Sequence, residues 1–249
     1  QGFTTDTNST WLGTTLLPYG IIIQKKITVG DNINSIIHES QNILLDNYDF
    51  LFVTGGLGPT HDDITKEAFR QILDDDLVFD EDYYSLLKER FEKRLIKMPE
   101  INRTQAMMLK KADVIPNENG SALGMHFFYK ETHLFILPGV PGEMKTMVKK
   151  HIIPNYIKST SDEKFITIKT AGIMESKLAE RVSELMEKYS KSFRFAFLPH
   201  FNGVSFRISK SGEGNDLQKV KNEFYKEIQP YSYGTNNDTL ENITGQKLK

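Results

Sequence analysis

The sequence predicts an α/β protein with a mostly parallel sheet, followed by a smaller α+β unit. Apolar runs of strand length alternate with amphipathic stretches of helical period over the first 155 residues or so. A polar, linker-like segment at residues 156–164 separates this alternation from a later set of short strands and helices. Strands joined through helices form βαβ units, whose sheets bind ligands at the carboxyl ends of their strands.

The first part of the chain supplies most of the expected elements. Gly20 is expected to end the first helix, because glycine accepts the left-handed conformation that follows many helices. The helix at residues 80–98 is interpreted as a solvated face with its apolar side turned inward. The expected helices span residues 10–19, 32–45, 64–69, 80–98 and 102–108. The expected strands span residues 21–29, 50–53, 112–115, 126–129 and 132–137, the last two as a hairpin.

The second part predicts a small α+β unit in the same way. Val204, Phe206 and Ile208 alternate with polar residues, which is typical of a strand with one buried face. The expected strands span residues 165–170, 193–199 and 203–209, and the expected helices span residues 175–189 and 215–229.

The chain is organised around a glycine-rich turn, TGGLG at residues 54–58, which follows a short apolar strand and precedes a helix. Glycines permit positive φ and leave no Cβ between the main chain and a ligand, so amide groups can face an anion. Thr60 or Asp62 is expected to cap the helix that begins at Ile64, whose N-terminus favours phosphate. The stretch matches neither GxxxxGK[ST] nor GxGxxG. It predicts a phosphate site of another type.

Asp62 and Asp63 follow this turn directly. A diphosphate would repel both carboxylates unless a cation lay between them, and Mg²⁺ is usually held by one or two carboxylates together with phosphate oxygens. The pair therefore indicates a metal-bridged diphosphate. The alternative is that both are ordinary acidic residues at a helix N-terminus, where they are favourable. This alternative stays open for Asp62, whereas Asp63 is interpreted as functional.

The stretch TGGLGPTHDDIT, residues 54–65, resembles the signature of the molybdopterin-binding (MoaB/MogA-like) superfamily, in the variant found in the CinA (competence/damage-inducible protein A) family. A second block, LPGVPGEMKTM at residues 137–147, resembles the other signature of that family. Eukaryotic FAD synthases contain the same variant, so the motif alone does not fix the substrate. The resemblance implies a three-layer molybdopterin-binding-like domain over residues 1–157 and a small KH-like α+β domain over residues 165–233.

The resemblance also implies the site residues. It places Asp6 and Asn8 near the ligand, although both also suit an N-cap and turn. Arg103 is either a phosphate contact or an exposed arginine at a helix start, and His61 is interpreted as surface variation. The implied substrate-binding residues are Asn8, Thr54, Gly55, Gly56, Gly58, Thr60, Asn117, Gly120, Pro138, Gly139 and Glu143. The implied catalytic and metal-binding residues are Asp63 and Asp62.

The function that the resemblance implies is metal-dependent hydrolysis of the diphosphate of ADP-ribose, giving AMP and ribose 5-phosphate. The implied cofactor is Mg²⁺, Mn²⁺ or Co²⁺, with K⁺ as a further candidate ion. Two alternatives stay open, because fold alone does not decide function. One is molybdopterin adenylylation, and the other is a nucleotide-binding, dimerising module that regulates another domain. Family members usually associate, so a homodimer is expected.

Both ends of the chain are expected to be shorter than in the family. A first strand with an IGDE-type motif would precede residue 1. Residues 234–249 resemble the start of a linker to a C-terminal amidohydrolase domain that deamidates nicotinamide mononucleotide. That activity is therefore not assigned to these residues.

Composition excludes several classes of function. The 31 Lys+Arg and 33 Asp+Glu nearly cancel, and no GxxG clamp occurs between residues 165 and 229, so binding to nucleic acid or to an anionic membrane is not expected. The absence of cysteine excludes thiol catalysis and disulfides, and the six histidines lack zinc-site spacing. No apolar run approaches about 18–20 residues, so a cytoplasmic protein is expected.

Overall fold

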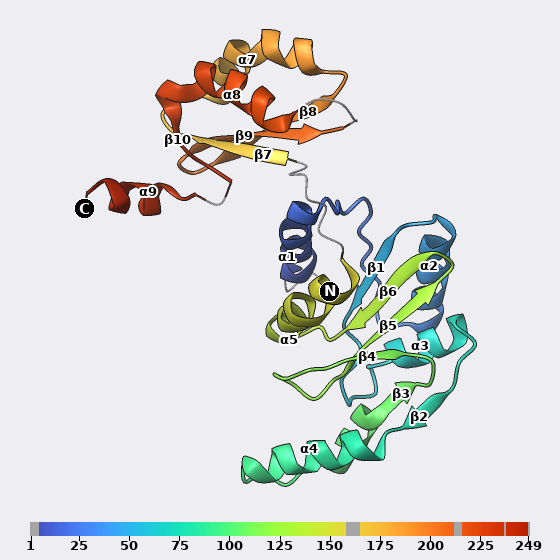
Figure 1. The fold of residues 1–249 in the computed structure, drawn as a ribbon. Helices are drawn as coiled ribbons and strands as arrows, with labels where there is room; N and C mark the ends of the chain where they lie inside the picture. The colour runs from blue at the N-terminus through green and yellow to red at the C-terminus, as the bar shows by residue number, and fades with distance from the viewer. Residues whose placement is uncertain (1–4, 158–164, 212–215, 237, 249) are drawn as a thin grey trace. The chain divides into compact units, whose positions relative to one another are not determined.

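The fold is that of a computed structural model, which describes residues 5–157, 165–211, 216–236 and 238–248. The chain divides into two compact units (Figure 1). The first unit comprises residues 1–15 and 22–158, and the second comprises residues 16–21 and 159–249. Most of the expected linker, residues 158–164, lies outside the described residues.

The main sheet of the first unit has the strand order β1-β6-β5-β4. β1 runs parallel to β6, whereas β5 is antiparallel to both β6 and β4. The expectation of a mostly parallel sheet is therefore wrong, because this sheet is mixed and β1 lies at its edge. The strands of this unit are β1 (Phe50–Thr54), β2 (Leu77–Phe79), β3 (Met107–Leu109), β4 (Asp113–Ile115), β5 (Gly124–Tyr129) and β6 (Thr132–Leu137).

The β5–β6 hairpin confirms the expectation for residues 126–137. Lys130 and Glu131, which join the strands, both have positive φ values of 46° and 66°. Two such residues turn the chain directly back on itself with the twist that antiparallel strands prefer. A parallel arrangement of β5 and β6 would need a crossover of a dozen or more residues.

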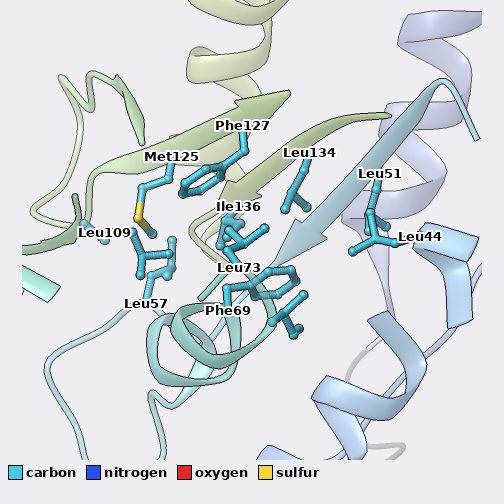
Figure 2. Close-up of a cluster of buried hydrophobic side chains, with 12 residues drawn as sticks. Leu44, Leu51, Leu57, Phe69, Leu73, Leu109, Met125, Phe127, Leu134 and Ile136 are labelled. Carbon is cyan, nitrogen blue, oxygen red and sulfur yellow. The ribbon is translucent and has the colours of Figure 1, made fainter. Parts of the chain in front are cut away.

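Helices cover both faces of this sheet (Figure 1). On one face, Leu44 of α2 and Phe69 of α3 join Leu134 of β6 in the main hydrophobic core (Figure 2). On the other face, the ring of Tyr156 in α6 packs edge-on against Phe135 at 5.3 Å. The unit therefore has three layers. Its helices are α1 (Thr7–Leu16), α2 (Ile33–Leu45), α3 (Thr65–Ile72), α4 (Glu81–Lys93), α5 (Pro141–Met147) and α6 (Ile153–Tyr156), with a 3₁₀ turn at Glu100–Ala106 and a π-helical turn at Val148–Ile152. The 3₁₀ turn at Leu17–Tyr19 falls in the second unit.

The strand expected at residues 21–29 is wrong, since the structure assigns no strand to this stretch. Its β-branched residues predict a strand, but a strand also needs ladder hydrogen bonds to a neighbour. Ile22 and Ile23 are 67% and 41% exposed instead. Lys25 pairs with Asp46 at the C-terminal end of α2. Gly20 does end the preceding helical turn, with φ of 76°.

The helix expected at residues 102–108 is found only in part, because residues 102–106 form a 3₁₀ turn and residues 107 and 108 lie in a strand. A 3₁₀ turn over Glu100–Ala106 leads into β3, which pairs with β2 in a separate two-stranded antiparallel sheet. Ala106 and Met108 are buried against Tyr83 and Tyr84 of α4. The helical turn thus ends at Ala106, and pairing with β2 keeps the next residues extended.

The second unit is an antiparallel sheet with the strand order β10-β7-β9-β8 and helices packed on it. Val204, Phe206 and Ile208 of β9 are buried against α7 and α8, as their alternation predicts. The expected linker at residues 234–249 overlaps β10 and contains α9. The elements are β7 (Phe165–Thr170), α7 (Glu175–Tyr189), β8 (Phe193–His200), β9 (Gly203–Lys210), α8 (Leu217–Ile228), a 3₁₀ turn (Gln229–Tyr231), β10 (Ser232–Thr235) and α9 (Leu240–Lys247).

Within the described ranges, no helix has the length and apolarity that crossing a bilayer requires.

Candidate functional site

Two turns meet at the carboxyl ends of the parallel strands β1 and β6. The glycine turn, residues 54–58, follows β1, and a second turn, residues 138–141, follows β6. The Gly55 amide donates to the carbonyl of Leu137 at 2.9 Å. A Cβ on Gly139 would lie 3.2 Å from the Gly55 Cα, so a residue without a side chain lets the two backbones touch. The sequence-predicted residues on these turns are Thr54, Gly55, Gly56, Gly58, Pro138 and Gly139.

The glycine turn presents backbone donors. Gly55 and Gly56 have φ values of 103° and 66°, which favour glycine. The Thr65 hydroxyl donates to the Gly55 carbonyl at 3.0 Å and holds the turn against α3. Among the described residues, the amides of Gly56, Leu57 and Gly58 have no hydrogen-bond acceptor. Because backbone amides are usually paired, three successive free donors indicate an anion site.

The start of α3 differs from the sequence expectation. Its N-cap is Ile64, which makes no side-chain cap, so the prediction that Thr60 or Asp62 caps this helix is wrong. The amide of Thr65 donates to the Gly56 carbonyl at 3.2 Å. The first helical N–H is therefore used inside the turn, and the free amides lie in the glycine turn rather than at the helix end.

Asp63 closes the loop that leads into α3. Its Oδ2 accepts hydrogen bonds from the Thr60 amide at 2.9 Å and from the Thr60 hydroxyl at 2.6 Å. A Cβ on Gly58 would overlap the Asp63 carboxylate, which explains the glycine there. Asp62, by contrast, is exposed. Both aspartates lie in the loop that joins the glycine turn to α3.

The donor set fits one type of metal site better than another. In the described part of the chain, no three His, Asp or Glu side chains form a group that could hold a metal ion. Asp62 and Asp63 offer carboxylate oxygens only. Such a pair suits a hard cation such as Mg²⁺, whose other ligands would be phosphate and water oxygens, and does not suit a tetrahedral zinc site.

Asn8 joins the site from α1. Its Nδ2 donates to the Gly139 carbonyl at 2.8 Å, while its buried Oδ1 has no partner among the described residues. Asp6 instead caps the N-terminus of α1. Its carboxylate accepts hydrogen bonds from the amide and hydroxyl of Ser9 and forms an ion pair with Lys26. These contacts hold the pKa of Asp6 well below its usual range. The N-cap interpretation of Asp6 is therefore confirmed.

Asn117, Gly120 and Glu143 form a second cluster. The Asn117 Nδ2 donates to Glu143 Oε2 at 2.6 Å, and its Oδ1 accepts from the Gly120 amide at 2.9 Å. Arg90 of α4 donates to the carbonyls of Asn117 and Gly120, both at 3.1 Å. Sequence reasoning missed Arg90, because it treated the polar residues of this helix as a solvated face.

Lys66 is a second residue that sequence reasoning missed. Its ammonium donates to the carbonyls of Thr104 and Met107, both at 3.0 Å. Burial lowers the pKa of Lys66 to about 8. Arg103, which the sequence left open as a phosphate contact or an exposed arginine, is exposed and lies over the ring of Phe79 at 4.4 Å. The sequence did hold one signal for Lys66, because a lysine in the first turn of a helix opposes the helix dipole.

Substitution of Gly120 by alanine tests the second cluster. The new Cβ would overlap the Glu143 carboxylate, which must move and lose its hydrogen bond from Asn117. We expect the free energy of unfolding, measured in urea, to fall by about 1–3 kcal/mol. Gly142→Ala is the matched control, because that Cβ has no atom within 4 Å. Equal stabilities of the two variants would contradict the packing described here.

Each of the two units matches a known family of domains. Residues 1–158 match the family model described as a probable molybdopterin binding domain. The chain is therefore an α/β protein of the molybdopterin-binding-domain class. Residues 166–231 match the model described as the KH domain of damage-inducible protein CinA. With both domains in this order, the chain belongs to the CinA family.

Relatives extend the match over the whole chain. A CinA-like protein of Chloroherpeton thalassium is 33% identical over 266 residues, covering 100% of this chain and 61% of the relative. A CinA-like protein of Flavobacterium psychrophilum is 36% identical over 231 residues, covering 90% of this chain and 54% of the relative. The crystal structure of CinA from Thermoplasma acidophilum aligns with a TM-score of 0.55 and 29% identity, covering 63% of this chain and 90% of that one. The chain thus spans about 60% of the length of such curated relatives.

Proposed function

We propose that the first unit is a metal-dependent hydrolase that cleaves the diphosphate of ADP-ribose into AMP and ribose 5-phosphate. The observation that supports it is the row of free amides at Gly56, Leu57 and Gly58, next to the carboxylates of Asp62 and Asp63. Free amides suit phosphate oxygens, and carboxylates beside an anion suit a bridging cation.

Each group has a distinct role in this proposal. The amides of the glycine turn bind and orient one phosphate, and Asp62 and Asp63 hold the cation. When bound, the divalent metal supplies charge neutralisation and an activated water. Water adds to one phosphorus, the bond from that phosphorus to the bridging oxygen breaks, and the two monophosphates leave. Asn8 fixes the second turn through the Gly139 carbonyl, which keeps the two turns in register.

The test is release of AMP from ADP-ribose by the 249-residue chain. We expect product, measured by chromatography, in the presence of Mg²⁺, Mn²⁺ or Co²⁺, with and without K⁺, and none in excess chelator. Binding of ADP-ribose is measured in parallel by calorimetry, together with binding of a pterin. Tight nucleotide binding without AMP release would replace the hydrolase by the regulatory module, and binding of the pterin alone would favour molybdopterin chemistry.

A further inference from the structure

Lys66 occupies an unusual position for a cation. It lies in the first turn of α3, where the helix dipole favours acidic side chains. Its side chain is partly buried, and burial of an ammonium group is costly unless an anion compensates it. Among the described residues, its Nζ pairs with no carboxylate and bonds only to the carbonyls of Thr104 and Met107.

An ammonium group has three N–H donors. Two of them serve these two carbonyls, so one donor remains. The Asp63 carboxylate favours the charged form from a distance, whereas Glu67 of the same helix pairs with Arg70 and Arg103 lies over aromatic rings. The charge on Lys66 is therefore incompletely compensated, and one of its donors is available.

The segment whose carbonyls bind the Lys66 ammonium, residues 104–107, also contacts the glycine turn. Gln105, between the two carbonyls, donates from Nε2 to the Leu57 carbonyl at 3.0 Å. Thr65, next to Lys66, bonds to the carbonyls of Gly55 and Gly56. The helix that carries Lys66 and the segment that binds its ammonium are thus both hydrogen-bonded to the loop that carries the free amides.

We infer that Lys66 is a phosphate-binding residue, which supplies the positive charge and the third N–H donor for an anion held by the amides of the glycine turn. The inference deepens the proposed diphosphate site and rests on it for the location of the anion, but it requires no hydrolysis. The expected ligand is a nucleoside diphosphate, bound through its phosphates.

Phosphate binding by Lys66 depends on pH. A bound phosphate favours the protonated ammonium, so binding raises the pKa of Lys66 from its ligand-free value of about 8. Above pH 8 the ligand-free amine is largely neutral, and binding must take up a proton. Affinity is therefore greatest below pH 8 and falls by up to about tenfold per pH unit above it.

The experiment measures calorimetric binding of ADP and of adenosine to the full chain at pH 7.0, 8.0, 9.0 and 9.5. The variants are Lys66→Met, which keeps the length and removes the charge, and Lys66→Arg, which keeps a charge that does not titrate in this range. Lys97→Met at an exposed position is the matched control. Thermal unfolding without ligand verifies that each variant is folded.

We expect Lys66→Met to weaken ADP binding at least tenfold at pH 7 and to leave adenosine binding unchanged. Lys66→Arg is expected to retain ADP binding and to lose its decline above pH 8, while Lys97→Met matches the wild type. Wild-type affinity of folded Lys66→Met for ADP would overturn the inference, as would equal losses for ADP and adenosine or absence of ADP binding to the wild type. ADP binding that depends on Lys66, with no hydrolysis of ADP-ribose, would refute the hydrolase and leave the inference standing.

Discussion

Replacement of Gly56 by alanine is expected to destabilise the first unit by about 2–5 kcal/mol and to abolish anion binding at the glycine turn. Two costs add together. Gly56 has φ of 66°, where an L-residue is strained, and its new Cβ would overlap the Thr65 hydroxyl. Thr65 cannot yield without losing its bond to the Gly55 carbonyl. Urea unfolding and calorimetry with ADP measure the two effects.

Gly172 provides a control that separates the two costs. Its φ of 74° is close to that of Gly56, but a Cβ there would have no atom within 4 Å. Gly172→Ala therefore reports the conformational strain alone, and we expect a loss of about 1–2 kcal/mol in the transition of the second unit. If Gly56→Ala cost no more than Gly172→Ala, the contact with Thr65 would not constrain the turn.

Elements set by neighbouring residues could be predicted from the sequence. The β5–β6 hairpin requires only two strand patterns and a two-residue connection at Lys130 and Glu131, and the structure has both. The buried alternation of Val204, Phe206 and Ile208 depends likewise on the local period of two. Such patterns identify an element and its buried face without reference to the rest of the chain.

The direction of strands and the existence of isolated strands depend on distant partners. The predicted hairpin already required β5 and β6 to be antiparallel, and the structure adds a second antiparallel pair between β4 and β5, which leaves only β1 and β6 parallel. At residues 21–29, β-branched residues indicated a strand, but a strand is defined by its ladder. The strand propensity of a residue does not show whether a partner strand lies beside it, and this is why the prediction for residues 21–29 failed.

The residues of the candidate site also fall into those that local sequence predicts and those that depend on distant partners. The motifs placed Gly55 and Gly139 on separate turns, and the parallel pairing of β1 with β6 brings them together. By contrast, no local pattern shows that Arg90 reaches the carbonyl of Gly120 or that Lys66 reaches that of Met107. These long side chains act across tertiary contacts, and a cation at a helix start was the one anomaly visible in advance.

Asp63→Asn is expected to reduce AMP release from ADP-ribose by about 10²–10³-fold, as loss of a charged group that stabilises the transition state does. Asparagine is nearly isosteric, and its Oδ1 can still accept from the amide and hydroxyl of Thr60. The variant therefore removes the charge and retains the turn. We expect its free energy of unfolding to change by less than about 1 kcal/mol.

Two companion variants make this result interpretable. Asp63→Ala removes both bonds from Thr60 and is expected to cost about 1–2 kcal/mol of stability in addition to activity. Asp62→Asn changes an exposed carboxylate that closes no loop, so any loss of turnover must come from its charge.

If Asp62→Asn raises the metal concentration needed for half-maximal AMP release, both aspartates hold the cation. If only the Asp63 variants lose turnover, Asp62 is an ordinary acidic residue of the helix start. Full turnover by Asp63→Asn would remove Asp63 from the chemistry and leave it as the residue that closes the turn.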